Sequence, residues 1–338
     1  MNRKVYKIDK SGAIDDLKLR DDILPEPAAH EATVEVKAIG LNFAEIFSIQ
    51  GLYKAAPKEN LIPGLEYSGV VLKTGAEVKN VKPGDRVMGV ARFGAYATHL
   101  NIDSRYLIPL PSEWSFEEGA GFLVQALTAY YGLVRLGALE NGYTVLIHSA
   151  AGGVGIWANR IARKYNAFTI GVVGSQRKVD FCKKEGYDEV IVRSDRFEED
   201  LKQKLNGRPL NLIMDSIGGK LFKAGYRILA PQGRVVVYGS ARYTSYGSRP
   251  NYLKLILTYL RRPKIDPQSM INYNKAIMGF NLIYLYEQAE LMHQIIAELN
   301  RLDLGKPIID SVFPFEKLRD AVYLLQSGKT AGKVVVKA

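Results

Sequence analysis

The chain is poor in metal-binding side chains: it has a single cysteine, Cys182, and four histidines in 338 residues. One cysteine excludes an intramolecular disulfide and fits a reducing compartment. The histidines lack the spacing of metal ligands; they are His30, His99, His148 and His293. No apolar run approaches the roughly 20 residues that span a bilayer, and the amino terminus lacks the apolar core of a signal peptide. These absences predict a cytoplasmic protein.

Acidic residues are fewer than basic ones, 35 against 46, and the formal net charge is +11. Such an excess is compatible with nucleic acid, an anionic membrane surface or a polyanionic cofactor. The sequence contains no zinc-finger, basic-zipper or RNA-binding signature, so we expect no nucleic-acid partner. The length is too great for one ordinary domain and favours two.

The hydrophobic pattern changes near Glu117. Before it, short apolar runs at 33–39, 67–73 and 86–90 are separated by Gly and Pro turns, which is typical of β-rich structure. After it, apolar segments alternate with helical stretches; they are 145–148, 169–173, 190–192, 212–214, 235–238 and 276–280. Such alternation predicts an α/β fold with a doubly wound parallel sheet of Rossmann type. Two amphipathic helices, near 288–302 and 315–326, and a strand at 333–337 end the chain.

A strand, a small-residue turn and a helix follow one another between Tyr143 and Arg163. The turn reads Ala150-x-Gly152-x-x-Gly155, and small residues there allow a tight turn and close approach of the backbone to a pyrophosphate. The helix that follows offers unpaired N–H groups to the phosphates. Because the three elements occur in the required order, the motif favours dinucleotide binding over a merely structural turn.

The second strand of this unit, 169–173, does not end in the carboxylate that holds the ribose hydroxyls in NAD-binding proteins. Gly174, Ser175, Gln176, Arg177 and Lys178 follow it instead, and Arg193 follows the third strand. These cations and the serine hydroxyl would bind a 2′-phosphate. A solvated first helical turn is the alternative, although basic residues there oppose the helix dipole. We therefore predict NADPH as the cofactor.

Motifs along nearly the whole chain carry a family resemblance. They are Gly40-Leu-Asn-Phe-Ala-Glu45, Gly51-Leu-Tyr53, Pro63-Gly-Leu-Glu-Tyr-Ser-Gly69, Lys82-Pro-Gly-Asp-Arg-Val87, the glycine turn, Asp215-Ser-Ile-Gly-Gly219 and Ser327-Gly-Lys-Thr-Ala-Gly-Lys333. Together they resemble the quinone oxidoreductases, a branch of the medium-chain dehydrogenase/reductase superfamily. Residues 246–286 and 309–317 look most like the vesicle amine transport protein relatives within that branch.

The resemblance implies a GroES-like, partly open β-barrel catalytic domain, formed by residues 1–122 and 288–338, beside an NADP-binding Rossmann domain at 123–287. It also implies a homodimer that forms through the last Rossmann strand. The implied catalytic residues are Asn42, which can donate to a substrate oxygen, and Tyr53, which acts as hydrogen-bond partner, proton donor or plain aromatic wall. The cofactor-binding residues are then Thr128, Ala150, Gly152, Gly153, Val154, Gly155, Gly174, Ser175, Lys178, Arg193, Tyr238, Phe280 and Lys333.

The resemblance also bears on metal chemistry. Asn42 and Leu65 stand where zinc enzymes of the superfamily have cysteine and histidine ligands, and only Glu66 is kept. Simple alcohol oxidation is disfavoured without a Lewis acid to stabilise an alkoxide. An acceptor that delocalises its own charge needs less help, so we predict zinc-independent hydride transfer from NADPH to a quinone or an α,β-unsaturated carbonyl.

Two other functions stay open. Residues 253–260 form an apolar stretch edged by Lys254, Arg261, Arg262 and Lys264, which could rest on an anionic phospholipid membrane if the fold served as a scaffold. The competing interpretation is that these apolar residues face the cleft or the core. The basic residues could alternatively serve a phosphate-rich substrate of an enoyl-thioester reductase.

Overall fold

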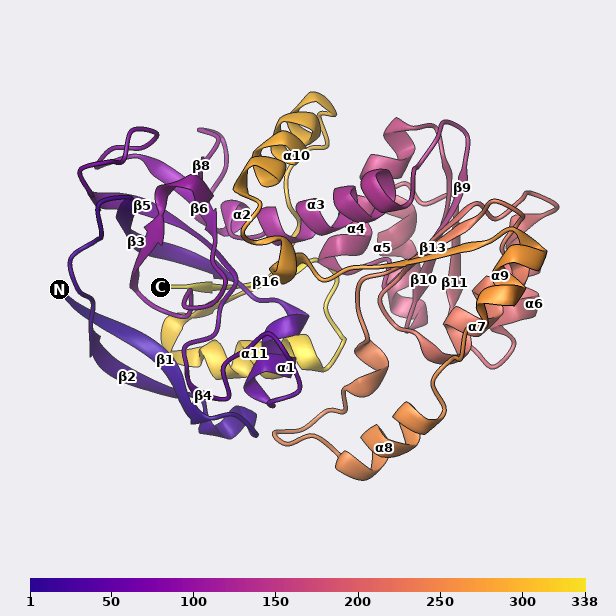
Figure 1. Ribbon diagram of the computed structural model, residues 1–338, viewed down its shortest axis with the longest axis horizontal. Coiled ribbons are helices and arrows are strands. Elements are labelled where there is room, and N and C mark those ends of the chain that lie inside the picture. The colour runs from indigo at the N-terminus through magenta and orange to yellow at the C-terminus, as the bar shows by residue number, and fades with distance from the viewer.

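Six parallel strands form the sheet of one half of the molecule in the computed structural model, which describes residues 1–338 (Figure 1). Their order is β11-β10-β9-β12-β13-β14. The bounds are β9 Thr144–His148, β10 Phe168–Val173, β11 Glu189–Val192, β12 Leu212–Asp215, β13 Arg234–Val237 and β14 Ala276–Gly279. All six predicted strands are confirmed. The chain runs outward from β9 and returns on its other side at β12, so a crevice opens at the carboxyl ends of these two neighbours.

Helices cover both faces of this sheet because the strand side chains alternate between two apolar layers. Leu146, Ile213 and Val235 pack with residues of α6 and α7, and Val145 and Val236 belong to the core on the other face. The helices are α3 Leu123–Tyr130, α4 Gly153–Lys164, α5 Val179–Lys184, α6 Phe197–Leu205 and α7 Gly219–Ile228.

The other half is a curved, mainly antiparallel sheet of order β15-β16-β3-β5-β6-β8, with β7 paired to β3, beside a small sheet of order β2-β1-β4. Both ends of the chain contribute to it, since β16 pairs with β3. Its strands are β1 Asn2–Lys10, β2 Lys18–Ile23, β3 Glu31–Gly40, β4 Glu59–Leu61, β5 Glu66–Thr74, β6 Arg86–Val90, β7 His99–Asp103, β8 Leu107–Pro109, β15 Ile309–Pro314 and β16 Lys333–Lys337. Its helices are α1 Phe43–Ile49, α2 Phe116–Gly119, α10 Ala289–Arg301 and α11 Leu318–Gln326. This half has the predicted GroES-like architecture.

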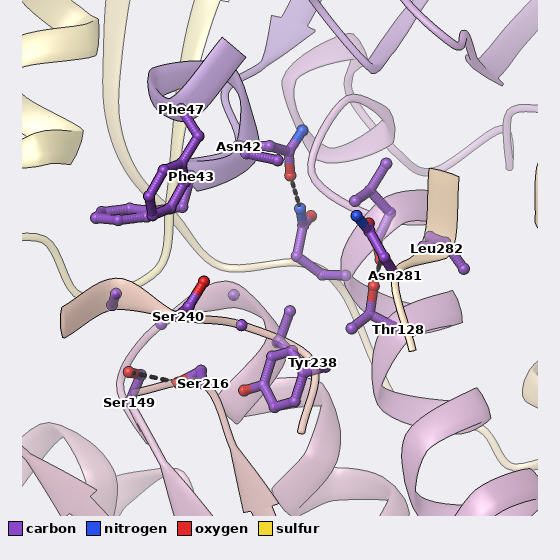
Figure 2. Close-up of a pocket in the computed structure, with 18 of the residues that line it drawn as sticks. Asn42, Phe43, Phe47, Thr128, Ser149, Ser216, Tyr238, Ser240, Asn281 and Leu282 are labelled. Atoms are coloured by element: carbon purple, nitrogen blue, oxygen red, sulfur yellow. Dashed lines mark hydrogen bonds between the residues drawn. The ribbon is translucent and has the colours of Figure 1, made fainter. Parts of the chain in front are cut away.

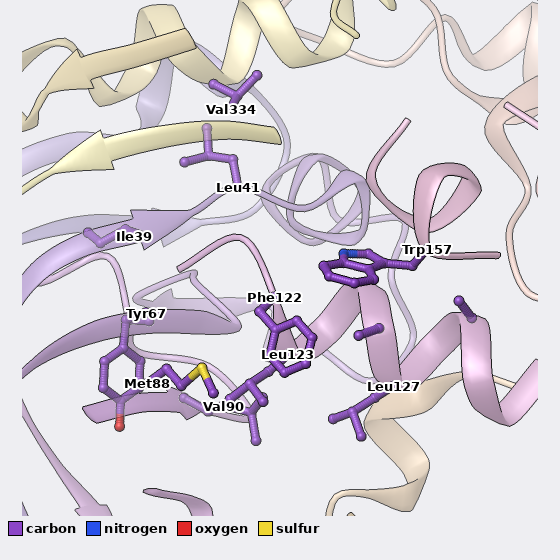
Figure 3. Packing of buried hydrophobic residues seen from close by; sticks show 14 of the residues in the cluster. Ile39, Leu41, Tyr67, Met88, Val90, Phe122, Leu123, Leu127, Trp157 and Val334 are labelled. Atoms are coloured by element: carbon purple, nitrogen blue, oxygen red, sulfur yellow. The ribbon is translucent and has the colours of Figure 1, made fainter. Parts of the chain in front are cut away.

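The two halves share one apolar core (Figure 3). The ring of Phe122 lies between Trp114 of the catalytic half and Trp157 of α4, with centroids 5.2 and 5.1 Å away. Leu123 and Leu127 continue the same cluster along α3. Such continuous packing fixes the two halves relative to each other. The six strands of the parallel sheet fall within 123–287, and these domain limits stay a prediction.

The segment between β13 and β14, which fits the strand–helix pattern least well, forms helices α8 Tyr252–Leu260 and α9 Pro267–Tyr273. The loop before α8 is tied to the catalytic half. The Gln50 amide donates to the carbonyls of Gly247 and Ser248, each at 3.2 Å, and the Ser248 carbonyl also accepts from the Ile14 N–H at 2.9 Å. α8 therefore lies beside the junction of the two halves, at the lower edge of Figure 1.

Candidate functional site

A cavity of about 1150 Å³ lies between the two halves and follows the carboxyl ends of the parallel strands (Figure 2). Both predicted catalytic residues, Asn42 and Tyr53, line it. So do all the predicted cofactor residues except Ala150 and Ser175. The side chain of Ala150 is fully buried, which makes this residue part of the packing beneath the glycine turn.

The glycine turn has the close geometry that a dinucleotide site requires. Ser149, directly after β9, takes a left-handed conformation with a φ of +55°, and α4 begins at Gly153. A Cβ atom on Gly155 would lie 2.5 Å from the carbonyl oxygen of Ser149 and 2.6 Å from that of Ala150, so no larger residue fits. The turn thus brings bare backbone N–H groups and the amino terminus of a three-turn helix to the cavity wall.

Two cations without a carboxylate partner lie at this end of the cavity. The Lys178 ammonium donates to the carbonyls of Gly328 and Thr330, at 2.8 and 2.6 Å, and the Arg193 guanidinium packs against Gly174. Burial lowers the pKa of both side chains, since it disfavours the charged form. Because these cations make no ion pair, an anionic ligand would supply the missing charge.

A pair of hydroxyl groups lies at the strand ends and was not predicted from the sequence. The Ser216 Oγ donates to the Ser149 Oγ at 2.9 Å, and both residues line the cavity between the glycine turn and Tyr238 (Figure 2). Each serine directly follows one of the two strands that flank the switch point, β9 and β12. That position is the signal that could have identified them.

The opposite wall is a buried polar network around Asn42. Its Nδ2 donates to the Gly40 carbonyl at 3.1 Å and to the Glu66 carboxylate at 3.0 Å. Its Oδ1 accepts from the Gln125 amide at 2.6 Å and from the Lys333 ammonium at 3.0 Å. The amide of Asn42 is therefore fully engaged within the protein. Donation to a substrate oxygen, which stays a prediction, would require one of these bonds to open.

Glu66 and Lys333 form a buried ion pair in this network, with side chains 1% and 5% exposed. Gln125, also absent from the sequence-based predictions, donates to the Glu66 carboxylate at 2.9 Å. The structure brings together no group of three or more His, Cys, Asp or Glu side chains that could hold a metal ion. The carboxylate of Glu66 is thus neutralised by a lysine.

Tyr53 crosses the cavity. Its hydroxyl donates to the Oδ1 of Asn281, 2.7 Å away and two residues after β14, and burial raises the pKa of Tyr53 to about 12. Asn281 had not been predicted, and only its position directly after Phe280 could have marked it as a site residue. Two further candidates have local partners: the Thr128 hydroxyl bonds the Val124 carbonyl at 2.6 Å within α3, and the Phe280 ring stacks on Tyr238.

Glu45, which is buried beside Asn42, is expected to make stability depend on pH. Burial raises its pKa to about 7, although the Asn42 N–H, the Tyr96 hydroxyl and Lys333 act in the opposite direction. Between about pH 4.5 and pH 7 the folded protein binds more protons than the unfolded chain. The free energy of unfolding should therefore fall by about 3 kcal/mol as the pH rises through this range. Urea denaturation at pH 5, 6, 7 and 8 measures it.

The matched variant is Glu45→Gln, which cannot titrate. It should be less stable than the wild type at pH 5, because Oε1 and Oε2 both accept hydrogen bonds, and its stability should change little up to pH 8. The same slope in both proteins would assign the pH dependence to another group.

Both halves of the chain match known protein families. Residues 28–112 match the alcohol dehydrogenase GroES-like domain, and residues 153–297 match the domain described as zinc-binding dehydrogenase. The synaptic vesicle membrane protein VAT-1 homolog of Rattus norvegicus is 35% identical over 330 residues, which cover 96% of this chain and 81% of the relative. The chain belongs to the medium-chain dehydrogenase/reductase superfamily. Within it, the relatives confirm the quinone oxidoreductase branch and the VAT-1-like group.

Solved structures agree over the full length. Quinone oxidoreductase of Escherichia coli, crystallised with NADPH, has a TM-score of 0.86, with 27% identity and 100% coverage of both chains. The CurK enoyl reductase has a TM-score of 0.83 with 28% identity and 99% coverage of both chains. The chain is thus a member of an oxidoreductase family with quinone oxidoreductase and enoyl reductase neighbours. No helix of the structure is both long enough and apolar enough to cross a membrane.

Proposed function

We propose that this protein is a zinc-independent oxidoreductase that uses NADPH to reduce a quinone or an α,β-unsaturated carbonyl compound. The observation that carries the proposal is the pair of cations without acidic partners, Lys178 and Arg193, at the cavity end where NAD-binding proteins have a carboxylate. NADPH, when bound, supplies a hydride from C4 of its nicotinamide.

Different residues of the chain bind different parts of the cofactor. The turn at Gly152–Gly155 and the amino terminus of α4 receive the pyrophosphate, and Lys178 with Arg193 receives the 2′-phosphate. The Ser149–Ser216 hydroxyl pair lies between this end and Tyr238. Phe280 and Tyr238 wall the cavity beyond it, so the reactive end of the cofactor would face Asn42 and Tyr53.

The polar groups at the reactive end support this acceptor class. The Tyr53 proton is directed at Asn281, and a phenol with a pKa of about 12 is a weak acid. The Glu66 carboxylate is neutralised by Lys333 and is not available to a metal ion. These two groups therefore favour an acceptor that needs neither a strong acid nor a Lewis acid. A quinone spreads the negative charge after it accepts the hydride, and a proton from water completes the hydroquinone.

The test is NADPH oxidation by the purified full chain with a panel of ortho-quinones, para-quinones and α,β-unsaturated ketones, with NADH in parallel. We expect saturable turnover with quinones that favours NADPH and persists after dialysis against a chelator, with well under one zinc per chain. NADPH binding without turnover of any acceptor would contradict the proposal, as would stoichiometric zinc whose removal abolishes turnover.

An anionic membrane surface is a second candidate, favoured by the exposed face of α8. Leu253 and Leu260 are 70% and 64% exposed, Lys254 lies in the first turn of the helix, and Arg261 follows its last residue. We propose peripheral contact between this face and anionic phospholipid. Co-sedimentation with anionic vesicles that is lost on charge reversal of Arg261 and Arg262 would support it. No sedimentation of the wild type would exclude it.

Three further predictions from the sequence belong to the proposal. The CurK neighbour keeps an enoyl-thioester reductase as an alternative, and saturable inhibition of NADPH oxidation by coenzyme A would favour it. The parallel sheet ends at β14, which leaves an edge for the predicted homodimer. A cytoplasmic location agrees with the single reduced cysteine, Cys182, which is buried and whose pKa burial raises to about 12.

A further inference from the structure

The cavity extends beyond the residues that the proposed function uses. Leu255, Ile256 and Tyr259 of α8 line it, together with Phe43 and Phe47 of α1. The rings of Phe43 and Phe47 lie 6.0 Å apart and stand together on one side of the cavity, opposite Asn281 and Leu282 (Figure 2). One wall of this extension thus comes from each half of the molecule, and both walls are apolar.

Helix α8 is held in place over this extension. The Arg242 guanidinium donates to the Thr258 carbonyl near the end of the helix, and the Asn251 side chain caps its start. The loop before it bonds to Gln50, and the Gln326 amide donates to the carbonyls of Ser245 and Gly247 at 3.1 and 2.9 Å. These bonds tie the segment that carries α8 to Gln50, directly after α1, and to the end of α11.

Apolar side chains of α8 are exposed to solvent. Ile256 and Tyr259 line the cavity and are nevertheless 57% and 55% exposed. An exposed apolar strip that continues a binding cavity marks a place where a ligand covers it. The charged residues of this helix and its flank, Lys254 and Arg261, do not line the cavity. α8 therefore offers apolar side chains and no charged side chain to a ligand in the extension.

We propose that the hydride acceptor carries a long apolar tail, an alkyl or isoprenoid chain, which lies between α1 and α8 while its carbonyl ring faces Asn42 and Tyr53. This inference rests on the proposed function and names the substrate class of the same site. Such a tail agrees with a cavity that is continuous from the reactive end to α8.

The experiment uses the full chain with NADPH and para-quinones that share one ring and differ only in alkyl tail length. For the wild type, kcat/KM should rise about twofold to fourfold for each methylene that becomes buried, and then level off. Leu255→Ser removes the apolar wall and should lower kcat/KM for a long-tailed quinone about tenfold, with no change for the tailless ring. Leu253→Ser, on the same helix but outside the cavity, is the matched control and should behave as the wild type.

Other outcomes overturn the inference separately from the proposed function. Turnover of the tailless quinone without any gain from a tail would refute the tail site and leave the reductase intact. Equal losses in Leu253→Ser and Leu255→Ser would place the tail on the outer face of α8, as on a lipid surface. If no quinone is turned over, quenching of protein fluorescence by the long-tailed quinone still decides: binding weakened only by Leu255→Ser supports the site, and no binding refutes it.

Discussion

Replacing Lys178 with glutamate is expected to raise the Kd for NADPH about a hundredfold and the Kd for NADH only a few-fold. A charge-assisted hydrogen bond contributes about 1.5–3 kcal/mol, and the reversed charge would repel the 2′-phosphate. NADH lacks that phosphate, so its affinity should fall only by what the altered loop contributes to binding. Fluorescence titration of both reduced cofactors against wild type and variant measures the two constants side by side.

The control for this prediction has to separate charge from loop structure. Lys178 also holds the carbonyls of Gly328 and Thr330, so its loss loosens a loop that both cofactors pass. Lys184→Glu makes the same charge change at an exposed position later in α5, outside the cavity, and should leave both constants unchanged. An equal loss of NADPH and NADH affinity in Lys178→Glu would refute the 2′-phosphate assignment.

The fold was predictable from the sequence because its signals are local. Each strand of the parallel sheet is a short continuous apolar run, and the glycine turn lies between the first strand and its helix within about one dozen residues. The backbone crowding at Gly155 is a consequence of that turn alone. Lys178 and Arg193 come shortly after strands of this sheet, so they could be predicted for the same reason. Both line the cavity.

The reactive end was less predictable because its contacts join distant parts of the chain. Glu66 and Lys333 are 267 positions apart, and Tyr53 and Asn281 are 228 apart. No periodicity links such residues, so Gln125 and Asn281 had no signal of their own. The role of 253–260 was also undecided for a physical reason: one helix presents Leu255 to the cavity and Leu253 to solvent. The cleft interpretation therefore holds for part of this stretch, and membrane contact stays a prediction.

Replacing Lys333 with methionine is expected to lower the free energy of unfolding by about 3–5 kcal/mol, because it leaves the Glu66 carboxylate buried without a countercharge. Asn42 and Gln125 would still donate hydrogen bonds to that carboxylate, but neither neutralises it. Urea denaturation of the apoprotein measures the loss. Adding Glu66→Gln in the same chain removes the unpaired charge and should recover most of the stability.

Strand β16 contains the matched control for this substitution. Lys337 bonds to the Glu117 carboxylate at 2.7 Å, as Lys333 bonds to Glu66, but its side chain is 63% exposed and already solvated. Lys337→Met should therefore leave the unfolding midpoint unchanged. Equal effects of the two substitutions would show that burial does not govern the Glu66–Lys333 pair. A large loss confined to Lys333→Met would mean that the polar wall of the cavity depends on a buried cation that the protein itself supplies.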